Sequence, residues 1–471
     1  MGRLVWRSRK RWPGVRRWTA QLALVAGLMA SAAPLRAQDR PPVGVAPQPS
    51  IAERFPVDQS SRLWLAEKGI TYGLIHTTEV LSNVAGGLRR GTVFDGKLEA
   101  MLGIDFGRLA GLDGLTFYGN AFQLHGGRGP GRELVGGLNT ISNIEALPTT
   151  RLSELWLEQQ FAGGKASLRA GQLVTDTEFL VSQYFNMFIT SDWPTNPKAN
   201  IPGGGPAYPL STPGVRLKID PTPQTTALLA VFNGDPAGRC GRDPELCNRH
   251  GVNFRVNDPP YVIGEVQYRY NQEAASRGLA GGVRLGAWHH FDRFDDLRFD
   301  TDGLSLADPS SSGIARRLEG NSGVYGVIDQ QLYRPQGADA NSGVLAFARV
   351  AYSTPDRSLN DLFIDGGLVF QGLWAARPAD GFGASFLYAH VSERARALDR
   401  DVRRLTGLAI PLRDYELSFD LTYSAAIMPG WTVQPNLQFV VHPGGHVPRA
   451  DAPTEPVKNA VIVGFRSTMR Y

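Results

Sequence analysis

Residues 416–423 read Glu-Leu-Ser-Phe-Asp-Leu-Thr-Tyr, a strict alternation of polar and apolar side chains. Successive residues of a β-strand point to opposite faces, so this stretch predicts a strand with one polar and one apolar face. The polar face carries Glu416, Ser418, Asp420 and Thr422, and the apolar face carries Leu417, Phe419, Leu421 and Tyr423. Such a strand fits a soluble sandwich, with the apolar face inside, or a membrane barrel, with the apolar face on lipid.

The same alternation recurs from Gly69 onward, in segments that are mostly close to the 9 to 11 residues a tilted strand needs to cross a membrane. Sixteen segments fit: 68–79, 93–106, 115–125, 151–162, 165–173, 212–220, 225–232, 260–271, 279–291, 322–333, 342–353, 362–372, 381–391, 413–424, 431–441 and 458–469. In the last one, the apolar face carries Val461, Val463, Phe465, Met469 and the terminal Tyr471. An aromatic end is expected of a closing strand at an interfacial girdle.

The lengths of the connections separate the two folds. Short connections such as 163–164, 221–224 and 425–430 alternate with long ones, including 174–211, 233–259 and 292–321. Outer-membrane barrels have short periplasmic turns and long outer loops, whereas a soluble sandwich gives no reason for this asymmetry. The sequence therefore predicts an all-β protein, a transmembrane antiparallel β-barrel of about 16 strands over residues 68–471. A barrel of this size encloses a lumen that side chains cannot fill, which predicts a channel.

The N-terminal 37 residues predict a signal peptide. Seven Arg and Lys between Arg3 and Arg17 precede the apolar stretch 22–33, and Leu35-Arg36-Ala37 offers a cleavage site. Residues 38–67 are then a periplasmic segment before the barrel. Removing residues 1–37 leaves 41 basic and 44 acidic residues, a net charge of −3. The mature chain therefore lacks the basic balance expected of a nucleic-acid partner, and export points to the outer membrane of a Gram-negative bacterium.

Cys240 and Cys247 lie seven positions apart in a stretch rich in Gly, Pro and charge. In an oxidising compartment this spacing favours a small loop-closing disulfide. A metal pair with His250 is the less favoured alternative, because a structural zinc site needs four ligands. No Gly-x-Ser-x-Gly element is present, and His289 and His290 point to opposite faces of a strand, so no enzyme, metal or cofactor is predicted.

The connection at 174–211 is unusually rich in aromatic residues, with Phe179, Tyr184, Phe185, Phe188, Trp193 and Tyr208. An apolar loop at the mouth of a wide lumen is better buried inside than left in water. We therefore expect a constriction carrying Phe188, Trp193 and Tyr208, although packing against a neighbouring subunit or the rim is an alternative. Charges of both signs are expected around it on the wall, at Glu154, Glu158, Arg169, Glu265 and Arg269. Mixed signs suit a neutral sugar better than an ion, which needs a ring of one sign.

The chain also resembles the OprB-like carbohydrate-selective porins. The resemblance rests on an ordered set of segments: 151–159 (Arg-Leu-Ser-Glu-Leu-Trp-Leu-Glu-Gln), 170–172, 178–179, 205–209 (Gly-Pro-Ala-Tyr-Pro), 231–236 (Val-Phe-Asn-Gly-Asp-Pro), 264–268, 329–331, 415–416, 434–438 and 442–445 (His-Pro-Gly-Gly). It covers roughly residues 65–471. It implies a monomeric or trimeric sixteen-stranded pore for glucose and related sugars, with charged and aromatic residues at the narrowing. The terminal Tyr471, where the family more often has Phe, and the cysteine-bearing loop depart from the family.

These observations predict a porin for passive diffusion of mono- and oligosaccharides. Its expected partners are those sugars, outer-membrane lipid, the barrel-assembly machinery during insertion and a possible homotrimer. A general or ion-selective porin is the first alternative, and a barrel enzyme such as a lipid hydrolase is the second.

Overall fold

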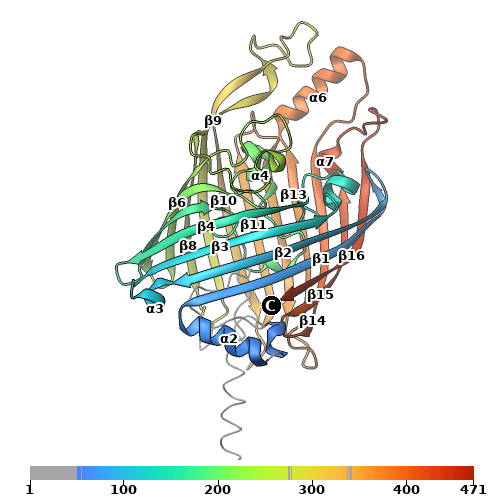
Figure 1. Ribbon diagram of the computed structural model, residues 1–471. Helices are drawn as coiled ribbons and strands as arrows, with labels where there is room; N and C mark the ends of the chain where they lie inside the picture. Colours follow the sequence, from blue (N-terminus) through green and yellow to red (C-terminus); the bar gives the residue numbers. More distant parts are fainter. Residues whose placement is uncertain (1–49, 55, 274–275, 277, 337, 339–341) are drawn as a thin grey trace, which may run out of the picture. The chain divides into compact units, whose positions relative to one another are not determined.

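In the computed structural model, residues 50–54, 56–273, 276, 278–336, 338 and 342–471 are described. The expected signal peptide and cleavage site lie outside these residues. The described chain forms sixteen antiparallel strands closed into a barrel (Figure 1), in which each strand pairs with its neighbours in sequence and β1 pairs with β16. The strands are β1 (Ile70–Gly87), β2 (Gly91–Asp105), β3 (Leu115–Gly126), β4 (Thr149–Phe161), β5 (Ala166–Leu173), β6 (Thr212–Thr222), β7 (Thr225–Asn233), β8 (Pro260–Tyr270), β9 (Gly281–Asp300), β10 (Ala315–Tyr333), β11 (Gly343–Ser353), β12 (Asn360–Gln371), β13 (Gly381–Val391), β14 (Tyr415–Met428), β15 (Trp431–Val441) and β16 (Lys458–Arg470).

Short helices interrupt the connections. They are the 3-10 helices η1 (Ile51–Arg54), η3 (Phe185–Met187) and η4 (Pro202–Gly204), the π-helix η2 (Gly131–Val135), and the α-helices α2 (Pro56–Glu67), α3 (Phe106–Ala110), α4 (Thr195–Asn200), α5 (Pro244–Cys247), α6 (Glu393–Thr406) and α7 (Pro443–His446). Across the described residues, no helix is both long and apolar enough to span a membrane.

The faces of the strands are distributed as a membrane barrel requires. In β14, Asp420 is fully buried toward the lumen, while Phe419 and Leu421 are 43% and 42% exposed on the outer surface. In β16, the inward Arg466 and Thr468 are buried, and the outward Phe465 is exposed. A soluble sandwich would bury the apolar face, so this inverted pattern excludes it.

The connections differ at the two ends of the barrel. Helix α2 and the C-terminus lie at one end, and α4, α6 and α7 lie at the other (Figure 1). The turns 162–165, 223–224 and 429–430 belong to the first end, and the long connections 127–148, 174–211, 234–259 and 392–414 belong to the second. Within 234–259, a disulfide joins Cys240 to Cys247.

The expectation of a long loop at 292–321 is wrong for most of that range, because β9 continues to Asp300 and β10 begins at Ala315, which leaves a loop only at 301–314. Directly opposed residues in this extension carry opposite charges: Arg293 pairs with Glu319 at 3.0 Å and Arg317 with Asp295 at 2.7 Å. Cross-strand ion pairs support a hairpin even where both of its faces are wet. Such a hairpin lacks the alternation of apolar side chains by which strands are recognised in a sequence.

Candidate functional site: a constricted lumen

The connection 174–211 is buried inside the barrel, as its aromatic content predicted. Phe185 and Phe188 are buried and pack on Phe347 of β11, with ring centroids 5.2 and 5.9 Å away. The backbone N–H of Leu180 donates to Glu265 at 2.7 Å, and the hydroxyl of Thr190 donates to Asp420 at 2.9 Å. We call residues 174–211 the inner loop. Three well-separated strands of the barrel hold the inner loop, through Glu265 of β8, Phe347 of β11 and Asp420 of β14.

A buried arginine supplies a further anchor for the inner loop. Arg349 of β11 forms an ion pair with Asp365 of β12, and both side chains are almost completely buried. Its guanidinium also donates to the carbonyl oxygens of Leu180 at 3.1 Å and Asp192 at 3.3 Å, and lies over the ring of Phe185. One cation therefore holds two separate points of the inner loop against the wall.

A second network of charges ties the inner loop to β4, β5 and β6. Glu158 accepts from Arg169 at 2.6 Å and from Arg216 at 3.1 Å, and Arg216 also binds Glu178 of the inner loop at 2.9 Å. Arg169 lies 3.8 Å from the ring centroid of Trp156. Such hydrogen-bonded charge pairs hold a buried segment in one position, because each charge would be left uncompensated if the segment moved away.

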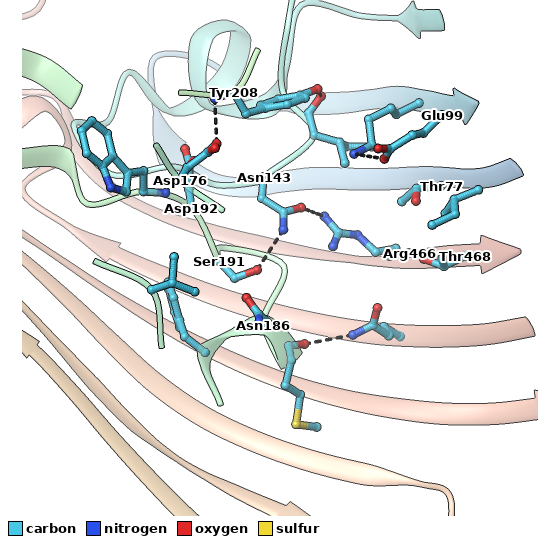
Figure 2. A pocket seen from close by; sticks show the side chains of 18 of the residues that line it. Thr77, Glu99, Asn143, Asp176, Asn186, Ser191, Asp192, Tyr208, Arg466 and Thr468 are labelled. Carbon is cyan, nitrogen blue, oxygen red and sulfur yellow. Dashed lines mark hydrogen bonds and ion pairs between the residues drawn. The ribbon is translucent and has the colours of Figure 1, made fainter. Parts of the chain in front are cut away.

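A cavity of about 250 Å³ separates the inner loop from wall residues of β1, β2, β3, β15 and β16, and Arg349 of β11, Gln371 of β12 and Ser424 of β14 also line it. Figure 2 shows the side chains that line it, with Tyr208, Asp176 and Asp192 on the inner loop and Glu99, Thr77, Arg466 and Thr468 on the wall. Asn143 bridges the two sides: it donates to the hydroxyl of Ser191 at 2.8 Å and accepts from Arg466 at 2.5 Å (Figure 2).

The expected site residues divide between these two sides. Trp193 and Tyr208 line the cavity, whereas Phe188 is packed away from it in the core. Glu154, Glu158 and Glu265 are buried, and Arg169 pairs with Glu158 and with Glu178 of the inner loop, but none of the four lines the cavity. Arg269 is an exposed residue at the turn end of β8, where its N–H donates to the carbonyl of Gln224, so it is not brought to the others.

The sequence did not reveal that the charged residues Lys97, Glu99 and Arg466 lie on the cavity wall. Lys97 and Glu99 are inward residues of β2 whose charged groups lie 3.3 Å apart, and Arg466 pairs with Glu79 of β1. Their alternation with Phe94, Leu98 and Leu102 marks an inward polar face in the sequence. Alternation alone does not tell which part of the wall an inner loop leaves uncovered.

Charged side chains of both signs line the cavity together with aromatic rings. Lys97 Nζ lies 4.9 Å from the ring centroid of Phe122 and 5.3 Å from that of Tyr208. Burial raises the pKa of Tyr208 well above its usual range, so its phenol stays neutral and donates to the carbonyl of Ile144 at 2.8 Å. The cations Lys97 and Arg466 face the anions Glu99, Asp176 and Asp192, which gives the passage no single sign.

The connection 127–148 contributes Asn143 and Ile144 to the lining of the cavity and contains a half-buried carboxyl, Glu145, which accepts from the backbone N–H groups of Ser142 and Gly131. Burial raises its pKa from 4.5 to about 8, and the nearby Asp95 and Glu79 add to the increase. The folded state therefore holds this proton more tightly than the unfolded chain does. Its contribution to stability is full below about pH 4.5 and is lost as the pH rises to about 8.

We expect the Glu145→Gln variant to lose this part of the pH dependence, because a neutral amide keeps an acceptor without a titrating proton. The measurement is the denaturant midpoint of unfolding in lipid across that pH range, for both proteins. Parallel curves for the variant and the unmodified protein would show that Glu145 does not titrate in this way.

A closed barrel with an apolar outer surface, a polar lumen and an inward-folded loop defines a membrane channel of the porin class. The family described as "Carbohydrate-selective porin, OprB family" matches residues 90–471. The chain belongs to this family. It is an outer-membrane carbohydrate porin of the Gram-negative type, and a channel instead of an enzyme, as the sequence predicted.

Individual relatives agree with this assignment. Porin B of Pseudomonas aeruginosa is 23% identical over 425 residues, which cover 86% of this chain and 88% of that protein. The putative porin QuiX of Acinetobacter baylyi is 19% identical over 82% of this chain and 87% of its own. The high-pH structure of Pseudomonas putida OprB superposes with a TM-score of 0.74 at 19% identity and covers 91% of this chain and 100% of that one.

Proposed function

We propose that neutral mono- and oligosaccharides diffuse passively through the cavity between the inner loop and the wall of β1–β3, β15 and β16. The observation that carries this proposal is the mixed lining of the cavity, in which Lys97, Glu99 and Arg466 stand beside Tyr208 and Trp193. Hydrogen-bonding groups of both kinds can replace part of a sugar's hydration shell. A filter for ions would instead present a ring of one sign.

In this mechanism the sugar moves down its own gradient. The carboxylate of Glu99 accepts from sugar hydroxyl groups, the cations of Lys97 and Arg466 donate to them, and the ring faces of Tyr208 and Trp193 lie against the C–H faces of the sugar. Asn143 and Ser191 hold the width of the passage, because their hydrogen bonds connect the inner loop to β16 through Arg466. Selectivity then arises from diameter and hydrogen bonding.

We infer the orientation of the barrel, its lipid contacts and its assembly from the fact that it is an outer-membrane porin. The end with short turns faces the periplasm, and the long connections face outward, as in other outer-membrane barrels. The outward residues Leu157, Phe419, Leu437 and Phe465 contact lipid, since they are exposed on the barrel surface. Insertion uses the barrel-assembly machinery, and a homotrimer is the assembly that we propose for the membrane.

The test is liposome swelling with a graded set of solutes, together with single-channel conductance. We expect glucose and short maltose oligomers to enter faster than amino acids of similar size and either charge, and to reduce the ion current as they occupy the passage. Rates that follow solute charge alone, with a current unaffected by glucose or maltose, would instead favour a general or ion-selective porin.

A further inference from the structure

Three potential metal ligands converge outside the lumen, at the end of the barrel that carries α7 (Figure 1). Asp414 immediately precedes β14, and His442 and His446 flank Pro443-Gly444-Gly445 in the connection after β15. Across the described residues, they form the single group of three or more His, Cys, Asp or Glu with ligand atoms this close, all within 4.8 Å of one another.

The two imidazole rings are stacked face to face beside the carboxylate. Their centroids are 4.1 Å apart and their planes differ by 7°. His442 Nδ1 lies 3.0 Å from Asp414 Oδ1, and His446 Nδ1 lies 4.0 Å from Asp414 Oδ2. The side chains are 26%, 29% and 27% exposed for His442, His446 and Asp414, so an ion from solvent can reach them.

An unusual backbone holds the rings in this position. His442, Gly444, Gly445 and His446 all have left-handed φ values, between 53° and 74°. Histidine seldom adopts this conformation, so the surrounding structure must hold it there. Here the N–H of Asp414 donates to the carbonyl of Gly445 at 3.0 Å, and the N–H of Gly444 donates to Glu416 at 2.7 Å.

We propose that Asp414, His442 and His446 bind a divalent transition-metal ion of the zinc class. Two imidazole nitrogens and one carboxylate oxygen are a ligand set that suits such an ion, and three protein ligands leave a position open for water. Because the rings are stacked with planes 7° apart, one of them turns about its Cβ–Cγ bond to direct its nitrogen lone pair at the ion. The alternative is a metal-free cluster in which a proton on His442 Nδ1 forms the 3.0 Å hydrogen bond to Asp414. This site goes beyond sugar passage and does not depend on it.

The ion would cross-link two segments at the end of the barrel that carries α7. It joins the start of β14 to the connection after β15. The adjoining Glu416 accepts from the N–H groups of Leu138 and Asn139, both at 2.7 Å. Asn139 in turn accepts from Thr195 of the inner loop at 3.0 Å. The metal therefore stabilises a region that is connected to the inner loop by hydrogen bonds.

The experiment uses the full-length mature protein, without an affinity tag of histidines, stripped with a chelator and titrated with Zn²⁺ by calorimetry. We expect one Zn²⁺ per chain, and binding at least about 100-fold weaker in both His446→Ala and His442→Ala, since even loss of an indirect partner of a metal ligand weakens binding by about 10–100-fold. Co²⁺ should give visible d–d absorption in the unmodified protein and lose it in both variants. Heat-modifiable migration in detergent confirms that each variant is folded.

Two controls separate this site from general histidine binding. His289→Ala removes a half-buried histidine whose Nδ1 lies within hydrogen-bond distance of the Ser322 hydroxyl. His125→Ala removes one member of the stacked His76–His125 pair, whose ring centroids are 5.7 Å apart. Both control variants should bind Zn²⁺ as the unmodified protein does. The proposal is overturned if the unmodified protein binds no Zn²⁺, if His442→Ala and His446→Ala keep its affinity, or if His125→Ala alone abolishes binding.

Discussion

The Arg349→Ala variant is expected to conduct more current through each channel and to discriminate less among sugars. Arg349 holds the carbonyl oxygens of Leu180 and Asp192, so its loss frees two points of the inner loop. Its removal also leaves Asp365 buried without its partner, which costs about 3–5 kcal/mol of folding free energy. Single-channel conductance and the denaturant midpoint of unfolding measure the two effects.

A double variant separates the two roles of this arginine. In Arg349→Met with Asp365→Leu, no charge is left unpaired, so stability should recover while the conductance stays high. Arg293→Ala is the matched surface control, because its pair with Glu319 is exposed and is worth at most about 1 kcal/mol. Unchanged conductance in Arg349→Ala would show that the other anchors of the inner loop suffice.

The Thr468→Trp variant is expected to have the opposite effect on transport. Thr468 faces the cavity from β16, and an indole at this position would occupy much of a space of about 250 Å³. If the ring adds about 1.4 kcal/mol to the barrier for passage, sugar flux falls about tenfold. Liposome swelling in glucose and single-channel conductance should fall together.

The neighbouring residue provides the control for this substitution. Met469 points outward from the same strand and is exposed on the barrel surface, so Met469→Trp places the same ring in lipid. We expect its glucose flux to match that of the unmodified protein. Equal losses in the two variants would mean that the passage does not run along β16.

Much of the wall could be predicted from local alternation. Each of the sixteen expected segments overlaps one strand in the same order, because lipid on one side and water on the other impose a period of two on every spanning strand. The extended hairpin of β9 and β10 was missed because it leaves the membrane and is wet on both faces. There, cross-strand pairs such as Arg293–Glu319 are the remaining signal.

The candidate site was only partly predictable. The aromatic residues of 174–211 indicated that the segment is buried, and Trp193 and Tyr208 do line the cavity. Arg216 and Arg349 were not recognised as anchors, because their partners Glu178 and Leu180 lie 38 and 169 positions away in the sequence. No local pattern connects residues at such separations.

The sequence by itself determined the inward and outward faces of the strands, because these depend on the polarity of neighbouring residues, and it predicted the barrel from those faces together with the alternation of short and long connections. It favoured burial of the inner loop through the aromatic residues of 174–211. The tertiary structure alone decided which side of the lumen the inner loop covers. That choice turned Glu158, Arg169 and Glu265 into anchors and left Lys97, Glu99 and Arg466 along the passage. It depends on contacts between distant strands that form only when the barrel closes.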